Sequence, residues 1–440
     1  MNRRDFVVAA GAAAATLKTA PKLAAQGGTP VRQTPLRATF WGPQYYDEKE
    51  RQGLLEVLET GRPFRYYGMG KTPPDKALTF EKEFAARMQV KYALGVSSGT
   101  AALQCAVAAC GIGPGDEVIL PAWTWHSCLC AVVLAGALPV MAEIDESFNI
   151  DPGDIEHRIT KNTKLIMAVH LQGNPADMDR ILPIARKHGI KVLEDCAQSV
   201  GASYQGRPVG SIGDIGIYSL QINKTFSAGE GGAVVTNDSL LFERAARFHD
   251  VGALRPPFAS QVGEPRSTGF AGTNFRLNEF SASVLLAQLR KLDTIVGDVR
   301  TNARRVYEGI HDLPGLKLRK LPDPGGELGS GIYIEFPTKA KKEEFQAAMK
   351  AENVPANGPS GSAILPLEKY VEDKVTVHPA WPSFNTPRGK AIRYGAASCP
   401  RTIDILSRFA GVLMDPKFTK RDTDDVVAAI RKVYPVVMKS

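Results

Sequence analysis

Three stretches of this 440-residue chain combine residue types that could bind and transform a small molecule. Each follows a short apolar run that reads as a β-strand, and in open parallel α/β sheets ligands bind at the carboxyl ends of strands. In the first stretch, Ser97-Ser98-Gly99-Thr100 leads straight into a predicted helix, whose free N–H groups and dipole can hold a phosphate. A simple Ser/Thr cap of the helix is the alternative for these residues.

The second stretch places a carboxylate, Asp195, at the end of the run Lys191–Glu194, with Gln198 three residues later. A carboxylate at a strand terminus can keep the nitrogen of a bound pyridine ring protonated, which makes the ring an electron sink. An ordinary helix cap or a structural ion pair is the alternative for Asp195.

The third stretch contains Ser219, then Lys224, then Gly229-Glu230-Gly231-Gly232. A lysine that is neutral part of the time can bond to a carbonyl carbon and carry a proton. Lys224 lies on a predicted loop with no acidic residue near it until Glu230. Taken alone, it therefore reads as a solvated loop lysine.

Between Lys91 and about Asp238, short apolar runs typical of strands alternate with helical stretches. This pattern predicts parallel strands joined by crossover helices, which must position these residues. Runs such as KLIMAVH are apolar on both faces, as expected for strands covered by helices above and below. The predicted strands are Tyr92–Val96, Glu117–Leu120, Pro139–Ile144, Lys164–His170, Lys191–Glu194, Asp214–Leu220 and Ala233–Thr236. The predicted helices are Thr100–Cys110, His126–Ala135, Met178–His188 and Ser239–Phe248.

The C-terminal part of the chain predicts a second, smaller α/β domain. Residues 252–272 are irregular and rich in Pro, Gly and Ser, and the amphipathic helix Asn278–Leu292 that follows them is expected to end the large domain. Further expected elements are a strand at Gly331–Phe336, helices at Lys341–Glu352 and Arg421–Tyr434, and a Pro-rich connector at Pro379–Pro387. The expected division is an N-terminal arm with a substrate-side loop (31–75), a large domain (76–292) and a small domain (293–440).

The composition and the apolar runs argue against nucleic-acid binding, a metal site and a membrane span. The chain carries 54 Lys+Arg against 46 Asp+Glu, a net charge of +8, but the basic residues are spread and form no block suited to nucleic acid. Its six cysteines include neither a CxxC pair nor a histidine at metal-ligand spacing, so we expect no metal site. After residue 30, no run approaches the roughly 20 apolar residues that cross a bilayer.

The N-terminus resembles a twin-arginine export signal. Arg3-Arg4 precedes an Ala-rich apolar stretch, Val7–Leu17, and small residues around Leu23-Ala24-Ala25 offer a cleavage site. We therefore expect residues 1–30 to direct export to the periplasm. The alternative is an Ala-rich helix that is never removed, on a cytoplasmic protein.

Longer motifs make the chain similar to the DegT/DnrJ/StrS family of pyridoxal-phosphate (PLP)-dependent sugar aminotransferases. The run EDCAQSVGASYQGRPVGSIGDIGIYSLQINKTFSAGEGG, residues 194–232, resembles the family core. SSGTAAL resembles its phosphate-binding turn, LPAWTW its aromatic segment, and VHLQGNPADMD its central strand and following helix. GTNFRLNEFSASVLLAQLRKLD resembles the segment whose Asn reaches the cofactor phosphate of the neighbouring subunit. The resemblance runs from about Thr39 to the C-terminus and is most specific between Ser97 and Leu292.

The resemblance implies a fold-type I PLP enzyme: a large α/β domain with a mostly parallel sheet flanked by helices, and a smaller C-terminal α/β domain. It also implies a role for each matching residue. Lys224 would form a Schiff base with the cofactor and shuttle a proton, and Asp195 would pair with the pyridine nitrogen. The remaining cofactor contacts would be Gln198 on the ring hydroxyl, Trp125 on the ring face, Gly99, Thr100 and Ser219 on the phosphate, and Asn274 on the phosphate from the partner chain of a homodimer.

Two stretches depart from the common pattern of that family. Cys128 stands where a small Ser or Thr is frequent, and Gln221-Ile222-Asn223 replaces the more usual aromatic or His-containing stretch before the lysine. These departures affect the expected identity of the substrate more than that of the cofactor. On the substrate side, Tyr66 and Tyr67 belong to a Tyr/Gly-rich loop and are otherwise packing residues, and His170 either lines the pocket or is structural.

The leading hypothesis is an aminotransferase that moves an amino group from glutamate or glutamine to a keto-sugar or keto-cyclitol. A PLP-dependent sugar dehydratase is the second hypothesis, but known versions of that chemistry replace the lysine with His. The third hypothesis is a non-catalytic PLP-fold sensor or binding protein. Export conflicts with the usual acceptors, because nucleotide-activated sugars are made in the cytoplasm.

Overall fold

The computed structural model describes residues 22–67 and 73–439. Arg3-Arg4 and the Ala-rich stretch of the expected export signal lie outside these residues. Within them, no helix is both long and apolar enough to span a bilayer.

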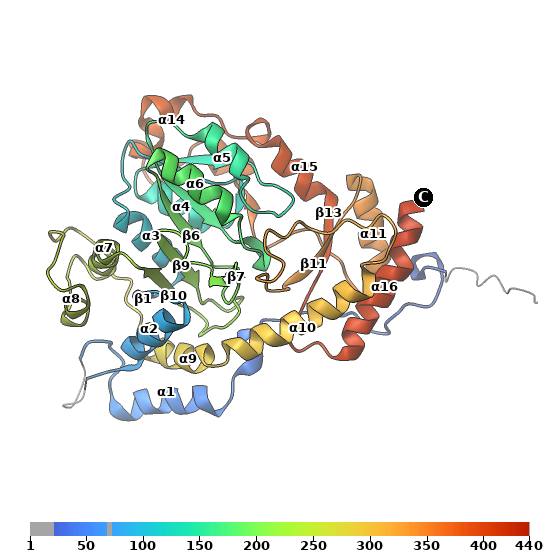
Figure 1. Cartoon of the computed structure of the whole chain (residues 1–440), viewed down its shortest axis with the longest axis horizontal. Coiled ribbons are helices and arrows are strands. Elements are labelled where there is room, and N and C mark those ends of the chain that lie inside the picture. The colour runs from blue at the N-terminus through green and yellow to red at the C-terminus, as the bar shows by residue number, and fades with distance from the viewer. Residues whose placement is uncertain (1–21, 68–72, 440) are drawn as a thin grey trace, which may run out of the picture.

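A seven-stranded sheet forms the centre of the molecule, and every strand predicted between Lys91 and Asp238 is present (Figure 1). Its order is β1-β10-β9-β6-β5-β2-β4. The five strands from β9 to β4 run parallel, whereas β10 is antiparallel to both β9 and β1. The strands are β1 Tyr92–Val96, β2 Glu117–Pro121, β4 Leu138–Ala142, β5 Thr163–Val169, β6 Lys191–Asp195, β9 Ile215–Ser219 and β10 Gly232–Thr236.

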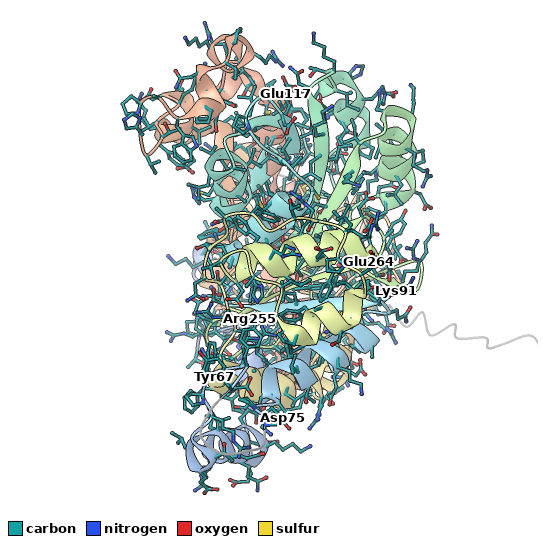
Figure 2. All side chains as sticks on the ribbon, turned by 90° about the vertical axis from the view of Figure 1, so that its left-hand side faces the viewer. Tyr67, Asp75, Lys91, Glu117, Arg255 and Glu264 are labelled. Carbon is teal, nitrogen blue, oxygen red and sulfur yellow. The ribbon has the colours of Figure 1, made fainter. Side chains whose placement is uncertain are left out.

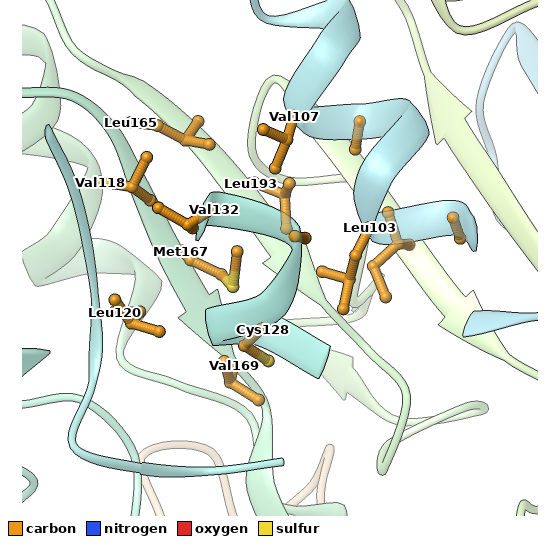
Figure 3. Packing of buried hydrophobic residues seen from close by; sticks show 14 of the residues in the cluster. Leu103, Val107, Val118, Leu120, Cys128, Val132, Leu165, Met167, Val169 and Leu193 are labelled. Carbon is orange, nitrogen blue, oxygen red and sulfur yellow. The ribbon is translucent and has the colours of Figure 1, made fainter. Parts of the chain in front are cut away.

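Helices cover both faces of this sheet, which is why the strands are apolar on both sides. Alternate residues of β5 point to opposite faces. Leu165, Met167 and Val169 pack under α3 (Gly99–Ala109) and α4 (His126–Leu134), as Figure 3 shows. Ile166 and Ala168 belong to the core on the other face, with α5 (Pro152–Arg158) and α6 (Met178–His188). Fully burying a large apolar side chain stabilises the fold by about 1.5–3 kcal/mol.

The remaining helices of the large domain surround this sheet and its edge, and α2 and α9 cover β1 and β10. They are α1 Glu48–Thr60, α2 Lys76–Arg87, α5 Pro152–Arg158, α6 Met178–His188, α7 Ser239–His249, α8 Pro256–Val262 and α9 Glu279–Leu289. A short hairpin, β7 Ser203–Tyr204 and β8 Arg207–Pro208, follows β6.

The second domain is a two-stranded antiparallel sheet packed against long helices, as expected for the C-terminal part. The predicted strand and both predicted helices are present, with ends shifted by a few residues. The elements are α10 Leu292–Ile310, β11 Gly331–Glu335, α11 Lys339–Ala351, α15 Pro400–Arg408, β13 Phe409–Leu413 and α16 Lys420–Lys439.

The chain before α1 does not form a separate unit, because residues on both sides of the expected boundary at residue 30 complete the core of the small domain. Leu23 and Leu36 are buried in that core. The buried carboxylate of Glu352 accepts hydrogen bonds from the N–H groups of Ala24 (2.8 Å) and Val31 (3.0 Å). A peptidase that cleaved after Leu23-Ala24-Ala25 would therefore have to reach a docked segment.

The expected boundary at residue 292 does not divide the chain into two separately packed parts, because the chain returns to the large domain after α11. β12 (Ala363–Ile364) pairs with β3 (Trp123–Thr124) beside the main sheet. Trp381 Nε1 then donates to the carbonyl of Val133 over 2.6 Å. The returning segment contains three short helices, α12 Lys369–Glu372, α13 Pro382–Asn385 and α14 Pro387–Ala391. The expected Pro-rich connector, Pro379–Pro387, contains α13 and ends where α14 begins.

Candidate active site

A cavity of about 490 Å³ opens where β5, β6 and β9 end and α3 begins. This is the place at which an open α/β sheet binds ligands. The cavity brings together most of the predicted site residues, from segments far apart in sequence. The walls are formed by Trp41, Ser98, Gly99, Thr100, Leu103, Thr124, Trp125, Ser127, Cys128, Val169, Gln172, Asp195, Ala197, Gln198, Ile217, Ser219, Gln221, Asn223, Lys224, Thr225, Glu230, Leu328, Ser330 and Gly361.

Lys224 lies in the turn between β9 and β10, and its N–H donates to the carbonyl of Gln221 over 2.9 Å. Burial of the side chain lowers the pKa of Lys224 below that of an ordinary lysine, and the negative charges of Asp195 and Glu230 partly oppose this shift. The neutral, nucleophilic form of the amine is therefore populated at lower pH than on a solvated lysine.

Asp195 is the last residue of β6, and its carboxylate is buried in the same cavity. Its Oδ1 accepts from the Ala197 N–H (2.9 Å), and its Oδ2 accepts from the Cys128 thiol (3.1 Å). Burial raises the pKa of Asp195, while these two hydrogen bonds and the charge of Lys224 oppose the rise. A buried carboxylate of this kind is stabilised by a cation placed against it, such as a protonated ring nitrogen.

The first turn of α3 forms an anion site at one end of the cavity. Ser98 caps the helix, since its Oγ accepts from the Ala101 N–H (3.1 Å), and this leaves the N–H groups of Gly99 and Thr100 for a ligand. A Cβ added to Gly99 would lie 2.5 Å from the Cβ of Ser219, so only glycine lets the two segments approach. The Ser219 side chain thereby lies beside the helix N-terminus.

Trp125 and Gln198 both line the cavity. Trp125 is exposed, whereas Gln198 is held by hydrogen bonds within the chain. Trp125 is 54% exposed, so a flat face is available to a ring. The Gln198 amide already donates to Ser362 Oγ (3.0 Å) and the Gly361 carbonyl (3.2 Å). Its contact with a ring hydroxyl stays a prediction.

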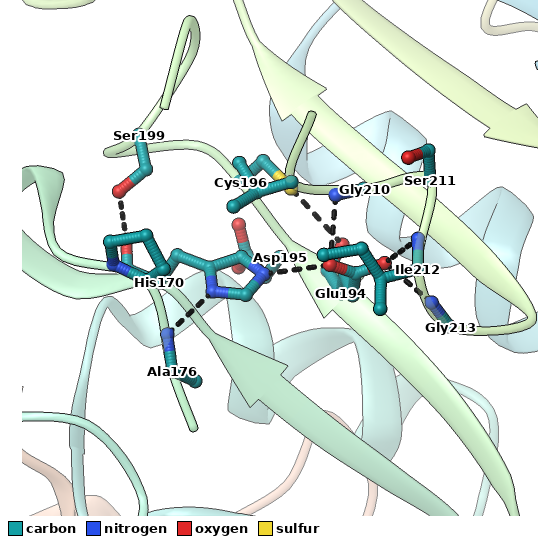
Figure 4. A network of polar contacts seen from close by, with 12 residues as sticks. His170, Ala176, Glu194, Asp195, Cys196, Ser199, Gly210, Ser211, Ile212 and Gly213 are labelled. Carbon is teal, nitrogen blue, oxygen red and sulfur yellow. Dashed lines mark hydrogen bonds and ion pairs between the residues drawn. The ribbon is translucent and has the colours of Figure 1, made fainter. Parts of the chain in front are cut away.

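His170 was expected to be structural or to line the pocket, and the structure places it in a network of polar contacts with Ala176 and Glu194 (Figure 4). Its ring is fully buried and is absent from the described cavity walls. His170 Nδ1 accepts from the Ala176 N–H (2.9 Å), so Nε2 carries the proton and donates to Glu194 (3.0 Å). The reason is the pleat: Glu194 and Asp195 are consecutive and point to opposite sides of β6.

Glu194 accepts several hydrogen bonds on the side of β6 opposite Asp195. Its two oxygens accept from His170 and from the N–H groups of Gly210, Ile212 and Gly213 over 2.6–3.0 Å. Burial raises the pKa of Glu194, but these hydrogen bonds more than offset the rise and hold it below its ordinary value. Ligand atoms of His170, Glu194 and Cys196 lie within 4.8 Å of one another, but the carboxylate oxygens are already occupied by N–H donors.

Three further predicted residues, besides His170, lie outside the cavity of their own chain. The Tyr66 hydroxyl lies 3.4 Å from His249 Nε2, and Tyr67 is 68% exposed on the face shown in Figure 2. Asn274 is exposed on the strand-like segment that pairs with Asp250. Their expected roles stay predictions.

Sequence reasoning missed the cavity residues that the arm and the C-terminal half supply. Trp41 arrives on the docked N-terminal arm, and Leu328, Ser330 and Gly361 arrive from the small domain and the returning segment. No spacing in the sequence signals them. Cys128 did carry a signal, because it stands where a small Ser or Thr is frequent in the family, three residues after LPAWTW.

The described walls fit a molecule with a phosphate at one end, a flat ring with a basic nitrogen, and an aldehyde. The α3 N-terminus would hold the phosphate, Asp195 the ring nitrogen and Lys224 the aldehyde carbon. The close approach of Gly99 to Ser219 makes the phosphate end a specific cradle.

Comparison with known proteins gives one consistent result. The family model of the DegT/DnrJ/EryC1/StrS aminotransferase family matches residues 46–431. The chain is 38% identical over 401 residues to an L-glutamine:2-deoxy-scyllo-inosose aminotransferase of Micromonospora echinospora, with 81% of this chain and 92% of the relative covered. It is 38% identical over 336 residues to 3-amino-5-hydroxybenzoate synthase of Amycolatopsis mediterranei, with 69% and 82% covered.

A solved structure agrees with these sequence matches. The crystal structure of S. venezuelae DesV in complex with a ketimine intermediate superposes with a TM-score of 0.73 at 29% identity. The superposition covers 91% of this chain and 98% of that one.

The Gly99–Ser219 approach predicts the effect of a single methyl group. Gly99→Ala should weaken binding of PLP by about 1–3 kcal/mol, because the new Cβ overlaps Ser219. Adding Ser219→Gly should restore part of the loss by making room. Gly113→Ala is the matched control, since its Cβ would meet nothing within 4 Å. Titration of the cofactor-free protein with PLP measures all four, and wild-type affinity of Gly99→Ala would contradict the cradle.

Proposed function

The chain belongs to the DegT/DnrJ/EryC1/StrS aminotransferase family, and from this membership we propose that it uses PLP, held covalently by Lys224, to aminate a keto-sugar or keto-cyclitol. The amino group would come from glutamine or glutamate. The observation that supports this most strongly is that Lys224, Asp195 and the N-terminus of α3 line one cavity.

Each of these groups has a distinct task in that chemistry. When bound, PLP supplies an electron sink for the carbon that loses a proton. The Lys224 amine would hold the cofactor and move the proton that the substrate carbon loses. Asp195 would hold the ring nitrogen in its protonated form, and the exposed indole of Trp125 would offer a face to the ring.

The proposed donor and acceptor follow the activities of several relatives. Three of them are L-glutamine:2-deoxy-scyllo-inosose aminotransferases. Other relatives are GDP-perosamine synthases, which keeps nucleotide sugars in the proposed substrate range.

The dehydratase and sensor hypotheses are less well supported. The dehydratase chemistry replaces the lysine by His, and Lys224 is present. A purely binding protein would have no use for an amine whose pKa is lowered by burial beside a carboxylate.

The absorbance of the purified protein tests the proposal. Wild type with PLP should show the band near ~420 nm that is typical of a lysine-bound cofactor, and glutamine or glutamate should shift it. Lys224→Ala should lack that band while still binding PLP. Lys187→Ala, an exposed lysine paired with Glu156, is the control and should behave as wild type. Identical spectra for wild type and Lys224→Ala would refute the catalytic role.

We further propose a homodimer whose sites are shared between subunits. Trp125, Tyr67 and Val251 are 54–68% exposed in the single chain, as expected for residues that a second copy covers. Asn274 is exposed and lies outside its own cavity, as expected for a side chain that reaches the cavity of a partner subunit.

Mixing two inactive variants tests the shared site. In a hybrid of Lys224→Ala with Asn274→Ala, one of the two sites receives both wild-type residues and the other receives neither. Random reassociation should therefore restore up to about a quarter of wild-type activity. If Asn274 acts within its own chain, the mixture stays as inactive as its components.

We propose that the protein is exported through its N-terminal twin-arginine sequence, in folded form and loaded with cofactor. Arg3-Arg4→Lys-Lys should move the protein from the periplasmic to the cytoplasmic fraction, as measured by cell fractionation and immunoblotting. Cytoplasmic recovery of both forms would refute export.

A further inference from the structure

A buried thiol contacts the carboxylate that faces the proposed ring position. Cys128 lies in the first turn of α4, is fully buried and lines the cavity. Its Sγ lies 3.1 Å from Asp195 Oδ2 and 3.2 Å from Thr124 Oγ1. The thiol is thus the only side-chain donor to Asp195 among the hydrogen bonds of the described residues.

The direction of the two hydrogen bonds follows from the number of protons. Burial and the nearby charge of Asp195 raise the pKa of Cys128, so the sulfur keeps its proton. That single proton can only be donated to the carboxylate, which makes the Thr124 hydroxyl the donor to sulfur. A chain therefore runs from Thr124 through Cys128 to Asp195.

The first link of this chain is anchored by the C-terminal half of the protein. Thr124 belongs to β3, whose backbone pairs with Ala363 of β12. The segment that contains β12 also accepts the hydrogen bonds of Gln198, through Gly361 and Ser362. The returning segment consequently supports groups on two sides of the cavity.

A thiol acts differently from the hydroxyl that is frequent at this place. S–H is a weak donor, whereas a hydroxyl hydrogen bond to a carboxylate is strong and lowers its proton affinity. The thiol can therefore fix the direction of Oδ2 while leaving more negative charge on it. The other oxygen is already held by the Ala197 N–H.

We propose that Cys128 is a positioning residue, which directs the Asp195 carboxylate toward the ring nitrogen and sets how much charge that carboxylate keeps. The inference rests on the proposed PLP-dependent function and adds a residue that tunes it.

The first test uses the protein without cofactor. The S–H stretching band in the infrared spectrum that is lost in Cys128→Ser identifies this thiol. Asp195→Asn should move that band to higher frequency, because an amide oxygen accepts a weaker hydrogen bond than a carboxylate. An unmoved band would overturn the contact, whatever the enzyme catalyses.

The second test uses the PLP-loaded protein and the donor half-reaction. Cys128→Ala should lower kcat on the order of three- to tenfold with little change in KM, the effect of losing one weak hydrogen bond from a thiol. Cys128→Ser should shift the pH dependence of the cofactor absorbance to lower pH, and Cys128→Ala to higher pH, because the hydroxyl removes charge from Asp195 and the methyl group does not.

A matched control separates tuning from general damage. Cys105→Ser introduces the same hydroxyl at another fully buried thiol, on α3. It should leave the pH dependence unchanged. Thr124→Val keeps the thiol and should show the kcat loss in weaker form.

The outcomes distinguish the two proposals. If wild type gives no spectral response to any donor, the aminotransferase proposal fails while the infrared test still stands. If wild type responds and Cys128→Ser, Cys128→Ala and Cys105→Ser share one pH dependence, the role of Cys128 is overturned.

Discussion

The site depends on placing an amine and a carboxylate in one buried cavity, where water no longer stabilises either charge. Burial lowers the pKa of Lys224 and raises that of Asp195, so each group is less charged than it would be in solvent. Their mutual attraction opposes both shifts. Such a cavity suits proton transfer and the binding of a cationic ring, because a bound molecule that carries charge alters the protonation of both groups.

The rest of the fold serves to hold these two side chains at one edge of the sheet. Parallel pairing brings the ends of β6 and β9 together, which no sequential spacing alone would do. On the far side of β6, Glu194 accepts four hydrogen bonds and fixes the strand end from behind. Of the two adjacent carboxylates, that of Glu194 anchors the backbone and that of Asp195 faces the cavity.

Sequence reasoning succeeded where a local pattern determines the structure. Apolar runs predicted the seven strands, and polar residues at or directly after their carboxyl ends predicted the positions of Asp195, Ser219 and the start of α3 in one cavity. It left alternatives open where placement depends on the strand pleat, and it failed where placement depends on distant partners. For His170 the structural alternative holds, because alternation along β6 points Glu194, its partner, away from the cavity, and a register shift of one residue would reverse this. β12 is only two residues long and carries no periodicity, so its return to the large domain could not be predicted.

The docked N-terminal arm has a consequence for synthesis of the chain on the ribosome. Ala24 and Val31 are made among the first residues, yet their hydrogen-bond acceptor, Glu352, lies more than 320 positions later. The arm also carries Gly42 against Phe226 and Ser227, next to the lysine turn. A nascent chain can therefore pair the strands of the central sheet early, but the small domain closes and the cavity gains its Trp41 wall only when translation is nearly finished.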